Sequence, residues 1–167
     1  FLKLFFFCLF VFYQSNTYSS EQKIVYLNLD EIIQKSIPGK LILQELQNQN
    51  KKNIEKFKSK RSNLLDEEKD IIKKKNILSK EEFEAKASDL NKKMKSFNKE
   101  REQTFLKFEE EKKKKLNNFL SKITPLIETF VKENSINLVL NEKNLFIANK
   151  NFDITKQVIE IVNKNIK

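Results

Sequence analysis

Between Leu41 and Thr124 the sequence contains no glycine and no proline, and its polar residues are mainly Lys, Glu, Asn and Gln. Glycine and proline are the two residues that most disfavour a helix interior, whereas Lys, Glu and Gln favour it. A stretch of this length without a helix breaker therefore predicts helices much longer than those of an ordinary globular domain. This constraint limits the fold more than any other feature of the chain.

Apolar residues recur in this stretch every three or four positions, which is the spacing of a coiled-coil seam. The first half of the seam contains Ile42, Leu46, Ile54, Phe57, Leu64, Ile71 and Leu78. The second half contains Phe83, Ala87, Leu90, Met94 and Phe97, followed by Arg101, Phe105, Phe108 and Lys112. Four polar residues interrupt the first half, namely Asn50, Arg61, Glu68 and Lys75. We therefore expect an exposed apolar groove rather than a tightly closed zipper.

A break in the helical pattern is predicted at residues 75–79. Asn76 can end one helix in a left-handed conformation, and Ser79 with Glu82 three residues later has the spacing of a capping box for the next helix. Residues 41–120 are therefore predicted to form a helical hairpin, which we term the arm. At about 1.5 Å per residue, its helices of ~37 and ~45 residues would extend roughly 55 to 65 Å.

The sequence on either side of the arm, residues 21–40 and 121–167, predicts a small β-rich body. Residues 23–29 are β-branched and aromatic and predict a strand, after which Asp30 would cap a short helix to residue 36. The runs at residues 137–141 and 145–149 predict a β-hairpin, and a last helix begins at Asp153 or Thr155. The predicted fold class is α+β, with the only glycine, Gly39, where the body meets the arm.

A body of about 75 residues with three short strands can bury little apolar surface by itself. We therefore expect it to close by homo-oligomerisation, although the residues do not indicate the number of copies. The residues predicted to build this oligomerisation body are Ile24, Tyr26, Leu27, Leu138, Leu140, Phe146, Ile154 and Val158.

The first 20 residues have the pattern of a secretory signal peptide. Lys3 precedes an almost unbroken apolar run to Tyr13, and small polar residues follow to Ser20. The run is shorter than the about 20 residues that span a bilayer. Cleavage would place the mature chain outside the cytoplasm, and an uncleaved anchor is the alternative. Cys8 is interpreted as a leader residue rather than a lipidation site, because the apolar run continues beyond it.

The residue types of the remaining chain exclude most catalytic chemistry. The sequence has no His, its one Cys lies in the leader, and one glycine is too few for a phosphate-binding loop. Acidic clusters such as residues 66–70 and 109–111 are interpreted as helix surface, because neighbouring residues of a helix point in different directions. We predict no enzyme activity, no catalytic residues, no cofactor and no metal site.

The net charge of +10 is concentrated on the arm: residues 40–133 hold 25 Lys and Arg against 17 Asp and Glu, a net of +8. An elongated basic surface with apolar gaps suits acidic partners or unfolded chains. Nucleic acid is not the expected partner, although residues 51–61 and 112–115 are basic runs, because acidic residues are interleaved and no aromatic platform for bases is evident.

Three segments in this order resemble the Skp (OmpH-like) family of periplasmic chaperones. They are the opening strand KIVYLNLDEIIQKSIPGK, the returning arm LSKEEFEAKASDLNKKMKSF and the closing NLVLNEKNLFIANKNFDITKQVI. The resemblance spans residues 23–166 and implies a homotrimer with a shared β-body and helical arms around a cavity. It implies an ATP-independent holdase that keeps unfolded outer-membrane proteins soluble in the periplasm. A basic cluster for lipopolysaccharide has no residue-by-residue match.

Client contacts on such an arm would combine apolar patches with positive charge, and a membrane surface is a further candidate partner. The candidate residues are Phe57, Leu64, Lys73, Lys74, Lys75, Phe83, Lys92, Lys93, Met94, Lys95, Phe97, Phe105 and Phe108. The alternative for each apolar residue is that it only joins the two helices, and for each lysine that it is solvated surface. The alternative for the whole chain is a structural coiled-coil protein tethered to the envelope without chaperone activity.

Overall fold

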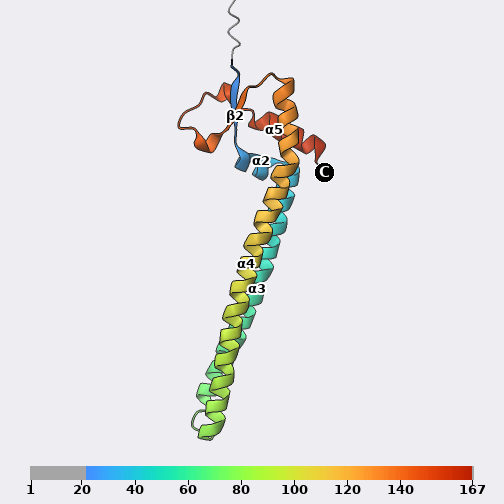
Figure 1. The fold of residues 1–167 in the computed structure, drawn as a ribbon. Coiled ribbons are helices and arrows are strands. Elements are labelled where there is room, and N and C mark those ends of the chain that lie inside the picture. Colours follow the sequence, from blue (N-terminus) through green and yellow to red (C-terminus); the bar gives the residue numbers. More distant parts are fainter. Residues whose placement is uncertain (1–21, 167) are drawn as a thin grey trace, which may run out of the picture.

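The computed structural model describes residues 22–166, so the predicted leader, residues 1–20, lies outside the described residues. Helices α3 (Ile37–Lys73) and α4 (Lys80–Glu133) run side by side and form the arm, which projects from a small body (Figure 1). The body contains strands β1 (Ile24–Leu27) and β2 (Leu138–Asn141), helices α2 (Leu29–Lys35) and α5 (Thr155–Asn165), and two 3-10 turns, η1 (Glu142–Asn144) and η2 (Lys150–Phe152).

The body and the arm meet without a flexible linker. Ser36 ends α2 and is also the N-cap of α3, where its Oγ accepts a hydrogen bond of 3.2 Å from the backbone N–H of Gly39. The backbone N–H of Ile37 donates to Oδ1 of Asn163 in α5 at 2.6 Å. Three helices are thus connected at the base of the arm, which fixes the direction in which the arm leaves the body.

Gly39 lies inside the first turn of α3 rather than at a break in the helical pattern. A Cβ atom at this position would lie 2.1 Å from the backbone oxygen of Ile33 and 2.7 Å from Oγ of Ser36. The glycine therefore permits the close approach of α2 to α3. The predicted helix cap at Asp30 is wrong, because α2 begins at Leu29 and the side chain of Asn28 accepts the capping hydrogen bond from Glu31.

The end of the arm is a short turn between Lys73 and Lys80. The capping box of Ser79 and Glu82 is present, as the sequence predicts. The predicted left-handed conformation of Asn76 is wrong: Ser135 is the one non-glycine residue with positive φ in the described part of the chain. Helix α4 has 54 residues and is longer than predicted, because it continues past Pro125 into the body.

The body contains less β structure than predicted, since the described residues form a single sheet of two four-residue strands. Strands β1 and β2 are parallel, with Ile24 opposite Leu138 and Leu27 opposite Asn141. The predicted hairpin is absent because the side chain of Asn141 accepts from the N–H of Lys143 and turns the chain into η1. Residues 145–149 form no strand, and Asn149 caps η2 in the same way.

The hydrophobic core lies where the body surrounds the end of α4. Ile32 of α2, Ile123 of α4 and Val158 and Val162 of α5 are each at most 1% exposed. The rest of the core consists of Val25, Leu27, Phe119, Ile136 and Ile154. The body is therefore a mainly helical unit in which β1 and β2 cover one side of the core.

Candidate functional site

The arm buries few of its apolar side chains. Between residues 41 and 118, only Leu46, Ile71 and Leu90 are buried hydrophobic residues. Phe57, Leu64, Phe83, Phe97 and Phe108, which lie in the seam, are half-buried. The rings of Phe57 and Phe97 contact each other edge to face, with centroids 5.9 Å apart and an interplanar angle of 73°. The two helices thus touch along the seam without enclosing it.

One side of the seam is bridged by ion pairs between the two helices, and we term it the ion-paired edge. Glu100 lies 2.8 Å from Nζ of Lys56 and 2.6 Å from Nζ of Lys60. Lys93 pairs with Glu67 at 2.7 Å, and nearer the body Lys115 pairs with Glu45 at 3.0 Å. All four ion pairs between α3 and α4 in the described chain lie on this edge.

Electrostatics on the ion-paired edge follow from these contacts. Hydrogen bonds from Lys56 and Lys60 lower the pKa of Glu100 from 4.5 to about 2. Hydrogen bonds to Glu67 and Asp89 raise the pKa of Lys93. These contacts favour the charged forms of both side chains, and the pKa shifts follow from that. At neutral pH this edge therefore holds paired positive and negative charges.

The other side of the seam is open and mostly apolar, and we term it the apolar edge. One groove, of about 280 Å³, is lined by Asn50, Asn53, Ile54, Phe57, Arg101, Thr104, Phe105 and Phe108. A second groove of about 280 Å³ is lined by Arg61, Leu64, Leu65, Glu68, Met94, Phe97, Asn98 and Arg101. Arg101 belongs to both grooves, so they form one continuous surface along the middle of the arm.

Exposed fractions show how far this surface is open to solvent. Ile54 is 58% exposed, Phe105 61%, Leu65 41% and Met94 40%. Exposed apolar side chains that are contiguous and rimmed by polar residues often mark interaction sites. The apolar edge is therefore the candidate binding surface of the arm.

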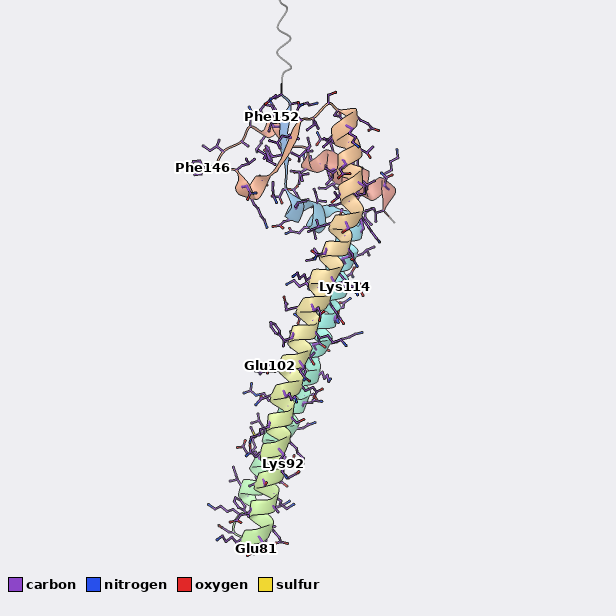
Figure 2. The ribbon with its side chains drawn as sticks, viewed as in Figure 1. Glu81, Lys92, Glu102, Lys114, Phe146 and Phe152 are labelled. Carbon is purple, nitrogen blue, oxygen red and sulfur yellow. The ribbon has the colours of Figure 1, made fainter. Side chains whose placement is uncertain are left out.

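The structure brings only some of the predicted client-contact residues to this edge. Met94 and Phe105 are exposed there, and Phe57, Leu64, Phe97 and Phe108 line its floor. Phe83 is half-buried near the tip. The predicted lysines are all exposed on the arm, where Figure 2 labels Lys92; they are Lys73, Lys74, Lys75, Lys92, Lys93 and Lys95. Lys74 pairs with Asp70, however, and Lys93 lies on the ion-paired edge. Their roles as client contacts stay predictions.

Four apolar or basic lining residues, Ile54, Arg61, Leu65 and Arg101, were not among those candidates. In the sequence, Ile54 and Arg101 occupy positions of the seam, Arg61 interrupts it, and Leu65 directly follows the seam residue Leu64. Their places on the apolar edge depend on how α3 and α4 are aligned. One signal was present in the sequence: Arg61 and Arg101 are its only two arginines.

The residues predicted for the oligomerisation body fall into two groups. Tyr26, Leu27, Ile154 and Val158 are buried within the chain itself. Leu140 is half-buried, whereas Ile24 is 41% and Leu138 47% exposed. Phe146 is 99% and its neighbour Ile147 83% exposed in the loop at the side of the body (Figure 2). The second group lies at the surface of this chain.

Two further features of residues 22–166 bear on function. No group of three or more His, Cys, Asp or Glu side chains in this part of the chain is arranged to hold a metal ion. None of the helices described between these residues combines the length and apolar composition required to cross a membrane.

The fold and its surfaces define a class of protein: a small, mainly helical body from which one long helical hairpin with an open apolar edge projects. Within this class the chain belongs to the OmpH-like family of outer membrane proteins, whose family model matches residues 23–162. The resemblance to the Skp (OmpH-like) family is thereby confirmed.

The fold is also found in a solved structure. The chain is similar to a proposed outer membrane chaperone (OmpH-like) from Caulobacter crescentus CB15, with a TM-score of 0.79 and 18% identity. The match covers 87% of this chain and 86% of the Caulobacter chain. At this identity the similarity establishes the fold. No curated protein matches the sequence.

Proposed function

We propose that this chain is an ATP-independent holdase chaperone that binds unfolded outer-membrane proteins in the periplasm and prevents their aggregation. The observation that carries the proposal is the apolar edge, which is held open along a rigid helical hairpin. Family membership and the similarity to a proposed outer membrane chaperone support the same function. An unfolded chain exposes apolar side chains that this edge can cover.

Binding would use many weak contacts rather than one tight site. Each groove of about 280 Å³ is small, so one arm covers only a short segment of a client. Several arms acting together raise the overall affinity through a high effective concentration, while each contact dissociates quickly. Release then requires no nucleotide, because a client that folds or inserts into a membrane withdraws its apolar segments one at a time.

This mechanism requires more than one copy, and the surface of the body supports homo-oligomerisation. Phe146 and Ile147 are mostly exposed, and the outer edge of β2 has no strand partner among the described residues, whereas the outer edge of β1 is bridged at Tyr26 by Asp153. We propose that residues 145–149 contact neighbouring copies, with a trimer whose arms surround a common cavity. The surface group of Ile24, Leu138 and Phe146 would then become buried in the assembly.

The test uses the mature chain, residues 21–167, and a urea-denatured β-barrel membrane protein diluted into buffer. We expect a molar excess of the chain to suppress the rise in light scattering, whereas an equal mass of serum albumin should not. Native mass spectrometry of the same sample should show an oligomer. Undiminished scattering would contradict the holdase and favour a structural coiled-coil protein, and a monomer at micromolar concentration would contradict the shared cavity.

A further inference from the structure

The two arginines of the sequence lie together in the apolar edge. Of the 33 basic side chains only Arg61 and Arg101 are arginines, one from each helix of the arm. Both line the same groove with Leu64, Leu65, Met94 and Phe97. Every other basic residue of the arm is a lysine, so the guanidinium groups of the chain are concentrated at one place.

Neither arginine forms an ion pair within the described residues. The described ion pairs involve only lysines, and Glu68, the one carboxylate that lines this groove, is not within 4.0 Å of either guanidinium group. The contrast with the ion-paired edge is direct, since Lys60 and Glu100, the immediate neighbours of the two arginines, pair with each other at 2.6 Å. The fold thus neutralises one edge and leaves two positive charges available on the other.

The surroundings favour a carboxylate as the partner of these charges. A guanidinium group presents its N–H donors in a planar fork that matches the two oxygens of a carboxylate, whereas a lysine acts as a point charge. When a client segment covers the groove, apolar neighbours such as Leu65, Met94 and Phe97 would exclude water from such a contact and strengthen it. Both arginines remain exposed, so a partner can reach them.

We infer that the apolar edge selects extended client segments in which an Asp or Glu side chain is flanked by large apolar side chains, with Arg61 and Arg101 binding the carboxylate. This inference rests on the proposed holdase function and specifies which segments the arm prefers. In an extended segment, side chains two residues apart point to the same side. A carboxylate at Arg101 would therefore place apolar neighbours over the grooves on both sides, one at Ile54 and Phe105, the other at Leu65 and Met94.

The test compares two fluorescent ten-residue peptides of alternating Phe and Ser, one with a central Asp and the other with Asn at that position. We expect the mature chain to bind the Asp peptide about three- to tenfold more tightly, the size of a solvent-accessible charge-assisted contact. The double variant Arg61→Gln/Arg101→Gln should lose this preference. The matched control Lys58→Gln/Lys99→Gln removes the same charge from exposed residues of the same helices and should keep it.

The outcomes separate this inference from the proposed function. Equal affinity for both peptides in the unchanged chain, with aggregation still suppressed, overturns the carboxylate preference and leaves the holdase intact. Failure to bind either peptide and to suppress aggregation contradicts the holdase itself. If the arginine variant keeps its peptide preference but loses binding to vesicles of phosphatidylglycerol, the arginines serve a lipid headgroup and the inference is wrong. Circular dichroism of each variant establishes that the arm remains helical.

Discussion

The body and the arm use apolar residues in opposite ways. In the body, Ile32, Ile123, Val158 and Val162 are almost completely buried, and α2, α4 and α5 all contribute to one core. In the arm, the seam residues Phe57 and Phe97 are half-buried, and Ile54 and Phe105 are mostly exposed. A two-helix hairpin has no third element to close the seam, so its apolar side chains remain accessible.

This difference suggests a division of labour within one chain. Stability comes mainly from the body, where burial is complete, whereas the arm is held straight by helix propensity, the seam and the ion-paired edge. An exposed apolar side chain adds little to folding and remains available for a partner. Matched substitutions in the two regions can therefore test whether the apolar edge is a free surface.

The largest difference in the free energy of unfolding is expected when an isoleucine is replaced by alanine once in the body and once in the arm. Ile123→Ala in the core, where the residue is 1% exposed, should lower the free energy of unfolding by about 3 kcal/mol through lost burial and a cavity. Ile54→Ala, where the residue is 58% exposed, should change it by less than about 0.5 kcal/mol, since alanine also has the better helix propensity.

Urea unfolding at one fixed protein concentration measures both effects. Tyr26 is the only tyrosine outside the predicted leader and the chain has no tryptophan, so tyrosine fluorescence reports on the body alone. Circular dichroism at 222 nm reports mainly on the long helices of the arm. A similar loss in the two variants would mean that the apolar edge is part of the fold and not a binding surface.

The second effect concerns the connection between the two regions. Gly39→Ala should destabilise the body by about 1–3 kcal/mol, because the new Cβ would overlap the Ile33 backbone oxygen. Helix propensity alone predicts the opposite sign, a gain of about 1 kcal/mol. Lys40→Ala, at the next and exposed position, is the control for propensity. Stabilisation by Gly39→Ala in tyrosine-monitored unfolding would show that α2 and α3 are free to move apart.

The sequence predicted the local features of both regions and missed those that depend on distant segments. Repeated spacing over many residues indicated the long helices, and the capping box at Ser79 followed from two neighbouring residues. The run at residues 145–149 has strand-like composition, but composition does not say whether a partner strand exists. The parallel pairing of Ile24 with Leu138 joins segments more than a hundred residues apart, which no local pattern could indicate.

The same reasoning explains the partial prediction of the candidate site. An exposed groove was expected because polar residues interrupt the seam, but which side of the seam is open depends on the alignment of α3 with α4. That alignment places Lys60 beside Glu100 and Arg61 on the same groove as Arg101. If α3 were displaced by one residue relative to α4, Lys60 and Arg61 would each face other residues of α4. Without that alignment, the sequence shows Arg61 and Arg101 only as polar residues at positions of the seam.

The smallest effect is expected at the ion-paired edge, and it is a dependence of the stability of the arm on pH. Because hydrogen bonds from Lys56 and Lys60 lower the pKa of Glu100 in the folded arm from 4.5 to about 2, the contacts stabilise the fold above about pH 4.5. That contribution is lost as the pH falls toward 2. The loss should be small and should shrink in high salt, since Glu100 is only partly covered and such pairs are screened.

The measurement is the carboxyl titration of Glu100 by NMR, together with arm unfolding by circular dichroism between pH 6 and pH 2. Glu100→Gln should remove part of the acid sensitivity of the arm, whereas Glu102→Gln, on the same helix and in no described ion pair, should leave it unchanged (Figure 2). If Glu100 titrates near pH 4.5, it does not form stable ion pairs with Lys56 and Lys60. The two edges would then differ in apolar exposure but not in the pairing of their charges. The arginines of the apolar edge would then lose the contrast that singles them out, because neither edge would be internally neutralised.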